Sequence, residues 1–234
     1  MPPPGVIAAR GVHPVDPFAA AFARAIRVRR GDSVLDLGCG AGAYGLATLA
    51  RGAARVVFAD RDPAAVACAI SNARRAGLAA RAEGRAGDLL APVAGERFDA
   101  IVAALPMLPG PPGLPLARAG GPDGTRLVLR CVRDAPRHLA TGGRLYLVLT
   151  DLAHPRRVLA ALRRRCTARR LARAERPVSR EEYDALLPGL WDHLLARCRA
   201  GTARLGGRGD RRVLGISLWE ARLRPGARRR TAAG

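Results

Sequence analysis

Short apolar runs alternate with longer amphipathic stretches along most of this chain. Nearly continuous apolar runs bounded by turn residues are typical of buried strands, and they occur at 34–37, 55–59, 97–104, 144–150 and 213–220, with a weaker one at 82–86. Apolar residues at helical spacing fall between them, at 18–28, 46–50, 64–76, 127–139 and 152–165. This alternation predicts a single α/β layered domain.

Residues 166–212 interrupt the alternation. Arg180-Glu-Glu-Tyr-Asp begins a helix with acidic residues in its first turn, and a second helical segment follows at 190–205. We therefore predict a helical insertion over about 166–212, before the last strand and near the ligand pocket. The expected organisation is an N-terminal lid segment and helix (1–27), a ligand-binding domain (28–224) and a disordered basic tail (225–234).

The stretch Val34-Leu-Asp-Leu-Gly-Cys-Gly-Ala-Gly42 joins a buried strand to a helix through a glycine turn. Such a turn brings backbone N–H groups and a helix N-terminus against a nucleotide-like ligand. Gly38, Gly40 and Ala43 fit a dinucleotide fingerprint, whereas Gly38, Gly40 and Gly42 fit the tighter turn of an S-adenosylmethionine (SAM) site. Asp36 favours SAM, because a carboxylate there attracts an ammonium group, directly or through water, and repels a pyrophosphate.

Two further acidic residues follow predicted strands. Asp60 lies 22 positions after Gly38, where an acid can accept both ribose hydroxyls of an adenosine. Asp88 follows the weak third strand and can bind the exocyclic amino group of an adenine. The alternative interpretations are a plain surface acid for Asp60 and a simple turn for Asp88.

The loop after the strand at 97–104 is dense in proline, and in an open parallel sheet it faces the reacting atom. Ala104, Leu105, Pro106 and Met107 are therefore expected to wall a substrate pocket. A stiff surface connection is the alternative interpretation.

Three residues are candidates for a general base, should the reaction need one. His13 and Asp16 are placed to line the pocket mouth, although a helix cap and a solvent-facing histidine explain them equally well. His193 lies on the predicted helical insertion, where a structural role is the alternative.

Composition restricts the partners. The net charge is +21 and every basic residue is arginine, a pattern that a GC-rich coding bias explains as well as a basic surface does. Aromatic residues make up 4%, which leaves little for base stacking. Five scattered cysteines indicate a reducing compartment and no metal site. Without a bilayer-length apolar run or a signal-peptide pattern, we expect a cytoplasmic protein with no membrane partner.

Over about residues 28–162 the chain resembles the class I SAM-dependent methyltransferases. The resemblance rests on four segments: Val34–Gly42, Val56-Val-Phe-Ala-Asp60, Gly87-Asp88 and Phe98-Asp99. It implies a Rossmann-like, doubly wound, mostly parallel seven-stranded sheet with helices on both faces and SAM as the cofactor. Asp36 would then serve the amino-acid end of SAM, Asp60 the ribose and Asp88 the adenine, with the three glycines giving close backbone approach.

Within that superfamily the chain is most similar to the release-factor glutamine methyltransferases. A Gly-Gly-x-Asp-Gly turn stands at 120–124, but the Asn-Pro-Pro-Tyr motif of that group reads Ala104-Leu-Pro-Met107 here. Ala104 cannot accept the hydrogen bond that holds the amide substrate of the group. We therefore predict a small-molecule acceptor in secondary metabolism. A ribosomal or translation protein, or an RNA, is the second hypothesis, a non-catalytic SAM-binding module the third, and a nicotinamide oxidoreductase a distant fourth.

Overall fold

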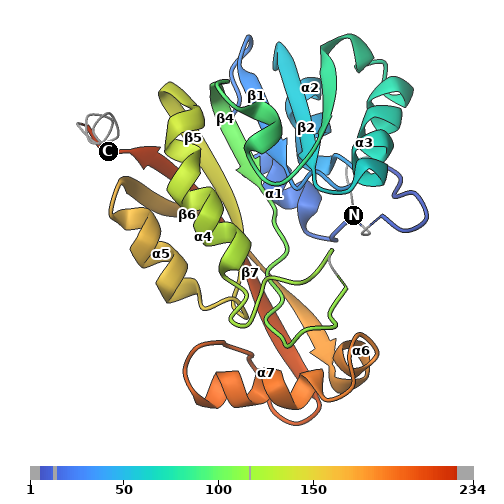
Figure 1. The fold of residues 1–234 in the computed structure, drawn as a ribbon, viewed down its shortest axis with the longest axis vertical. Coiled ribbons are helices and arrows are strands. Elements are labelled where there is room, and N and C mark those ends of the chain that lie inside the picture. Colours follow the sequence, from blue (N-terminus) through green and yellow to red (C-terminus); the bar gives the residue numbers. More distant parts are fainter. Residues whose placement is uncertain (1–5, 13–14, 116, 226–234) are drawn as a thin grey trace.

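A computed structural model of the chain describes residues 6–12, 15–115 and 117–225. In it, a single sheet carries helices on both faces (Figure 1). The strands are β1 (Ser33–Leu37), β2 (Arg55–Asp60), β3 (Ala82–Ala86), β4 (Phe98–Ala103), β5 (Leu139–Thr150), β6 (Cys166–Ser179) and β7 (Arg211–Leu223). The α-helices are α1 (Ala19–Ala25), α2 (Ala43–Ala50), α3 (Pro63–Arg75), α4 (Arg126–Asp134), α5 (Pro155–Arg163), α6 (Arg180–Asp184) and α7 (Leu190–Arg199). Short 3₁₀ turns are η1 (Ala79–Arg81), η2 (Ala91–Val93) and η3 (Ala135–His138).

The seven strands are ordered β3-β2-β1-β4-β5-β7-β6. Strands β1 to β5 are parallel, and β7 runs antiparallel to both β5 and β6. The predicted doubly wound, mostly parallel sheet is thus confirmed. The chain order reverses between β1 and β4, and in open sheets of this kind ligands bind outside the carboxyl ends of the strands at that point.

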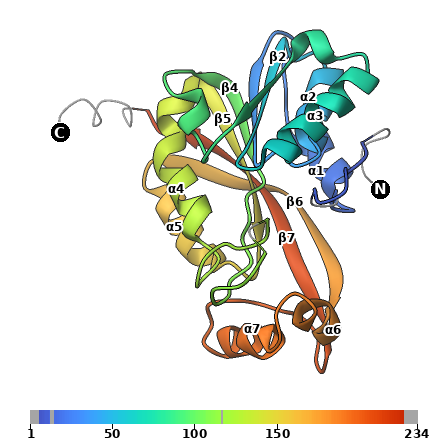
Figure 2. The ribbon, with the colours of Figure 1, turned by 45° about the vertical axis from the view of Figure 1, so that its right-hand side comes forward.

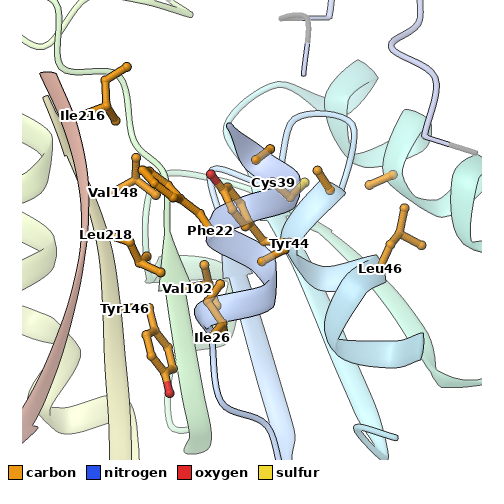
Figure 3. Close-up of a cluster of buried hydrophobic side chains, with 14 of the residues drawn as sticks. Phe22, Ile26, Cys39, Tyr44, Leu46, Val102, Tyr146, Val148, Ile216 and Leu218 are labelled. Atoms are coloured by element: carbon orange, nitrogen blue, oxygen red, sulfur yellow. The ribbon is translucent and has the colours of Figure 1, made fainter. Parts of the chain in front are cut away.

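Successive residues of each central strand enter two separate cores, because side chains alternate across a sheet. Val34 and Val56 belong to the core covered by α1, α2 and α3, whereas Leu35 and Val57 belong to the one covered by α4 and α5. Figure 3 shows Phe22 of α1 in the first core, among side chains from the glycine turn, β4, β5 and β7. Both faces of the central strands are therefore buried, which explains their continuous apolar sequences.

The predicted insertion is wrong over its first part, where residues 166–179 form β6. This strand pairs with β7 along its whole length at the edge of the sheet. Its sequence, Cys166-Thr-Ala-Arg-Arg-Leu-Ala-Arg-Ala-Glu-Arg, is rich in alanine and arginine and lacks an apolar run, because an edge strand buries little. Only α6 and α7 remain of the insertion, carried where β6 and β7 extend beyond the other strands (Figures 1 and 2).

The helix predicted over 127–139 ends at Asp134, and η3 follows it. Pro136 explains this early end, because its ring cannot continue an α-helix and removes an N–H donor. Strand β5 then begins at Leu139, five residues before the predicted strand.

Candidate cofactor and acceptor site

A cavity of about 600 Å³ opens at the carboxyl ends of β1 to β5, beside the reversal of strand order. One end lies against the glycine turn and the residues after β2 and β3. The other end reaches β6, α6 and β7. The predicted site residues that line it are Asp16, Gly38, Gly40, Asp60, Asp88, Ala104, Leu105, Pro106 and Met107. The expected substrate wall and most of the expected cofactor residues thus meet in one place.

Backbone N–H groups of the glycine turn are held by the end of β2. The N–H groups of Gly38 and Cys39 donate to the carbonyl of Ala59, at 2.8 and 3.1 Å. That of Gly40 donates to Oδ2 of Asp60 at 3.0 Å. A Cβ added at Gly40 would meet nothing within 4 Å, so this position leaves open space at the cavity wall. The turn is therefore a preformed cradle whose shape depends on Asp60.

Asp36 does not line the cavity. Its side chain is fully buried beneath the glycine turn, and Oδ2 accepts the N–H of Gly45 at 2.8 Å. Oδ1 is buried without a hydrogen-bond partner in the described chain. Burial raises the pKa of Asp36 to about 7; the Gly45 N–H opposes this rise, and the charge of Asp60 adds to it. In this structure the carboxyl group supports the turn from below, and the predicted direct approach to a ligand ammonium is not available.

Gly42 does not line the cavity either, which corrects its expected role in ligand approach. Its φ of +84° is in the left-handed region, and a Cβ there would lie 2.9 Å from the Cβ of Ala69 and 3.0 Å from Phe58. Gly42 is the N-cap of α2. The residue is glycine because α3 and β2 pack against it.

Asp60 and Asp88 have partners besides any ligand. Each Asp60 oxygen accepts one backbone N–H, from Gly40 and from Asp62, and a carboxylate oxygen has a second lone pair to offer. Asp88 is exposed and forms an ion pair with Arg130 of α4 at 2.7 Å. The sequence did not predict this pairing. The helical periodicity places Arg130 on the polar face of its helix and does not indicate a partner.

The polar residues at the far end of the cavity that were not anticipated as site residues include Arg118, Arg176 and Tyr183. Tyr183 is 2% exposed and comes from α6, so the helical insertion does reach the cavity. Arg176 is on β6, the strand that the apolar pattern did not reveal. Arg118 lies in the proline-dense connection, held by the bridge that pairs Leu108 with Ala119. Only folding brings these three residues together.

Of the two candidate bases that the structure describes, Asp16 lines the cavity and His193 does not. His13 lies outside the described residues. His193 of α7 does not line the cavity, and its Nε2 is buried without a hydrogen-bond partner. Burial and the charge of Arg197 lower its pKa, consistent with a neutral structural histidine. No cluster of metal-ligating side chains occurs in the described part of the chain.

Comparison with known proteins identifies the family of this chain. The model of the methyltransferase small domain matches residues 3–173. A release factor glutamine methyltransferase from Moorella thermoacetica is 41% identical over 128 residues, which are 49% of this chain and 44% of that protein. A ribosomal protein L11 methyltransferase from Aeromonas salmonicida is 38% identical over 80 residues, 34% of this chain and 27% of that one. The chain thus spans less than half the length of these relatives.

Solved structures agree on the fold. The YcgJ protein from Bacillus subtilis has a TM-score of 0.61 at 16% identity, covering 89% of this chain and 98% of that one. A SAM-dependent methyltransferase from Geobacter sulfurreducens, in complex with S-adenosyl-L-homocysteine, has a TM-score of 0.56 at 15% identity, covering 93% and 95%.

The two comparisons point to one class: the family model is that of a methyltransferase small domain, and the solved structure of similar fold is a SAM-dependent methyltransferase. The chain belongs to the methyltransferase small domain family. Within the described residues, no helix is long and apolar enough to cross a membrane.

Proposed function

We propose that this chain transfers the methyl group of SAM to a protein of the translation machinery, a release factor or a ribosomal protein. The observation that carries the proposal is the identity of 41% with a release factor glutamine methyltransferase, supported by the match to a ribosomal protein L11 methyltransferase. These relatives favour a protein acceptor over the small molecule that the altered loop at 104–107 suggested.

The cofactor end of the cavity fits SAM. Gly38 and Gly40 provide the close backbone approach, Asp60 retains lone pairs for the ribose hydroxyls, and Asp88 stands at the edge for the adenine amino group. Bound SAM supplies an electrophilic methyl group on a sulfonium. The chain contributes position, because a held nucleophile attacks in line without a covalent intermediate.

The acceptor enters past Leu105, Pro106 and Met107. These residues are nearly buried and apolar, apart from their backbone groups, so they exclude water from the reacting atoms. Asp16 lines the cavity together with Tyr183 and Arg176, and we assign its carboxylate to take a proton from the acceptor nitrogen or oxygen. Val12 and Phe18, on either side of Asp16, also line the cavity, which supports the hypothesis of an N-terminal lid.

A transfer assay tests the proposal. Purified chain is incubated with radiolabelled SAM and, separately, with release factor, with ribosomal protein L11 and with a small-molecule extract of cells. We expect label on one of the proteins, a mass increase of one methyl group on a single peptide, and loss of transfer in Asp60→Ala. Label confined to the small-molecule fraction would overturn the protein acceptor. Calorimetric binding of SAM without transfer to any acceptor would indicate a non-catalytic module.

A further inference from the structure

The acceptor end of the cavity is apolar except for a few polar side chains. Its walls include Val148, Leu152, Leu214 and Ile216, from β5, the segment after it and β7. The polar residues at this end are Arg118, Arg176, Tyr183, Asp16 and Thr150. The hydroxyl of Thr150 already accepts the N–H of Leu152 at 3.3 Å. A polar group placed in such surroundings selects a ligand, because leaving it unpaired on binding costs free energy.

Tyr183 is a buried residue whose hydroxyl has no hydrogen-bond partner in the described residues. Its side chain is 2% exposed, and its ring packs on Trp191 with centroids 5.9 Å apart. Its hydroxyl makes no hydrogen bond with any residue of the described ranges. Burial raises the pKa of Tyr183 to about 12, against the charges of Arg176 and Arg118, which lower it. The hydroxyl therefore stays protonated and can donate a hydrogen bond to a ligand oxygen.

Arg176 is not free to neutralise a ligand. Its two terminal nitrogens bind the two carboxylate oxygens of Glu182, at 2.9 and 2.7 Å. The carboxylate of Asp16 also acts on Arg176 and helps to raise its pKa. Two acids in the protein therefore compensate this guanidinium.

Arg118 is different. Its N–H donates to the carbonyl of Pro115 at 2.8 Å, and its carbonyl accepts the N–H of Leu108 at 2.9 Å, so its backbone is fixed. Its guanidinium forms no ion pair with any carboxylate in residues 6–12, 15–115 or 117–225. It is half-buried at the cavity, close enough for its charge to act on the Tyr183 hydroxyl. Within the described ranges, a guanidinium without a carboxylate partner and a hydroxyl without a hydrogen bond thus line the same cavity, within electrostatic range of each other.

We propose that Arg118 and Tyr183 together bind a carboxylate of the methyl acceptor, which makes the acceptor an acidic protein segment with an aspartate, a glutamate or a terminal carboxylate near the methylated atom. That the acceptor is a protein rests on the proposed function. A guanidinium matches a carboxylate in geometry, and the hydroxyl donates a second hydrogen bond to it. A phosphate dianion would bring a second negative charge for which Arg176, already compensated by two acids, offers no balance.

The probe that tests this is glutarate, with uncharged glutaramide and inorganic phosphate as comparisons. Binding is followed by nuclear magnetic resonance titration of the whole chain saturated with S-adenosyl-L-homocysteine, so that the carboxylate subsite of the cofactor is already filled. The variants are Arg118→Gln and Tyr183→Phe, with Arg163→Gln of α5 as the matched control. Arg163 is exposed, loses the same charge and does not line the cavity.

We expect glutarate to bind, and glutaramide to bind about tenfold more weakly or not at all. Arg118→Gln should weaken glutarate binding by about tenfold and Tyr183→Phe by about fivefold, with Arg163→Gln unchanged. Equal affinity for glutarate and glutaramide, or equal loss in Arg163→Gln, would overturn the proposal. Binding of phosphate in place of glutarate would overturn the carboxylate. Weaker S-adenosyl-L-homocysteine binding by Arg118→Gln would instead assign Arg118 to the cofactor. Because these are binding measurements on a small probe, they stand even if no translation protein is methylated.

Discussion

At the cofactor end of the cavity the polar contacts join backbone N–H groups to Asp36 and Asp60, whereas at the acceptor end they join side chains. The pair formed by Arg176 and Glu182, and the unpaired Tyr183 and Arg118, come from β6, α6 and the connection before α4. Backbone contacts fix one shape, so this end can serve only one kind of ligand. Side chains can be replaced singly while the sheet stays intact, so the acceptor end is where relatives of one fold can differ.

The largest effect is expected from breaking the ion pair between Arg144 of β5 and Asp32, just before β1, because it joins the two halves of the sheet. The atoms lie 2.8 Å apart, and the two side chains are 7% and 10% exposed. Arg144→Met leaves the Asp32 carboxylate buried without its cation, which should cost about 3–5 kcal/mol of unfolding free energy. Urea unfolding measures this loss. A loss below about 1 kcal/mol would show that water reaches Asp32 and compensates it.

Gly45→Ala tests the claim that backbone contacts fix the cofactor end. An added Cβ would lie 2.3 Å from Cε1 of Phe58 and 2.9 Å from Oδ2 of Asp36. The overlap should cost about 3 kcal/mol, which outweighs the roughly 1 kcal/mol that alanine normally gains in a helix. It should also weaken SAM binding, because the Asp36 contact under the turn is displaced. Calorimetry measures the SAM affinity and urea unfolding measures the stability of the same sample. An unchanged SAM affinity would show that the Asp36 contact does not maintain the ligand-binding shape of the turn.

Asp36→Asn tests the same end through pH. The raised pKa, about 7 against an ordinary value of 3.8, means that the folded chain binds the proton more tightly than the unfolded chain. The wild-type chain therefore loses stability from this group as pH rises from about 4 to about 7, and none of that loss occurs in the variant. Between pH 5 and pH 7 the variant should gain roughly 2–3 kcal/mol relative to the wild type. If the difference in unfolding free energy between the wild type and the variant did not change with pH, a raised pKa of the buried Asp36 carboxyl would be contradicted.

The smallest effect is expected at the surface beyond the acceptor end. Arg180 pairs with Asp192 and Asp210 at 3.0 and 3.1 Å, but all three side chains are well exposed. Solvent screens such pairs, so Arg180→Gln should leave the urea midpoint unchanged. A clear fall in the midpoint would indicate that these pairs hold α6, and hence Tyr183, in place.

The cofactor end was more predictable from sequence than the acceptor end, for a physical reason. The turn at 38–42 and the acid at 60 occur at fixed spacing because strand, turn and helix are consecutive in the chain. Tyr183 and Arg176 reach the cavity only when β6 pairs with β7 across a long connection. Because β6 is an edge strand rich in alanine and arginine, the apolar pattern did not indicate that pairing.

Predictions within the cofactor end also had a limit. Motif spacing placed Asp36 and Gly42 in the site, but it could not show which atoms face the ligand. Asp36 faces α2, and Gly42 faces α3 and β2. The motif spacing indicates that the turn requires these two residues. The packing shows that both support the turn from the side away from the cavity.

The side-chain amide of Asn72 on α3 links two parts of the site by hydrogen bonds. Its Nδ2 donates to the carbonyl of Ala41 in the glycine turn at 2.8 Å and to that of Ile7 in the N-terminal segment at 2.9 Å. Cys68, one turn earlier, holds the same segment through Ile7 and Ala9. Detachment of the segment therefore also disturbs the donor that steadies the turn. We therefore expect the residence time of a bound ligand to depend on Asn72, a side chain that does not line the cavity.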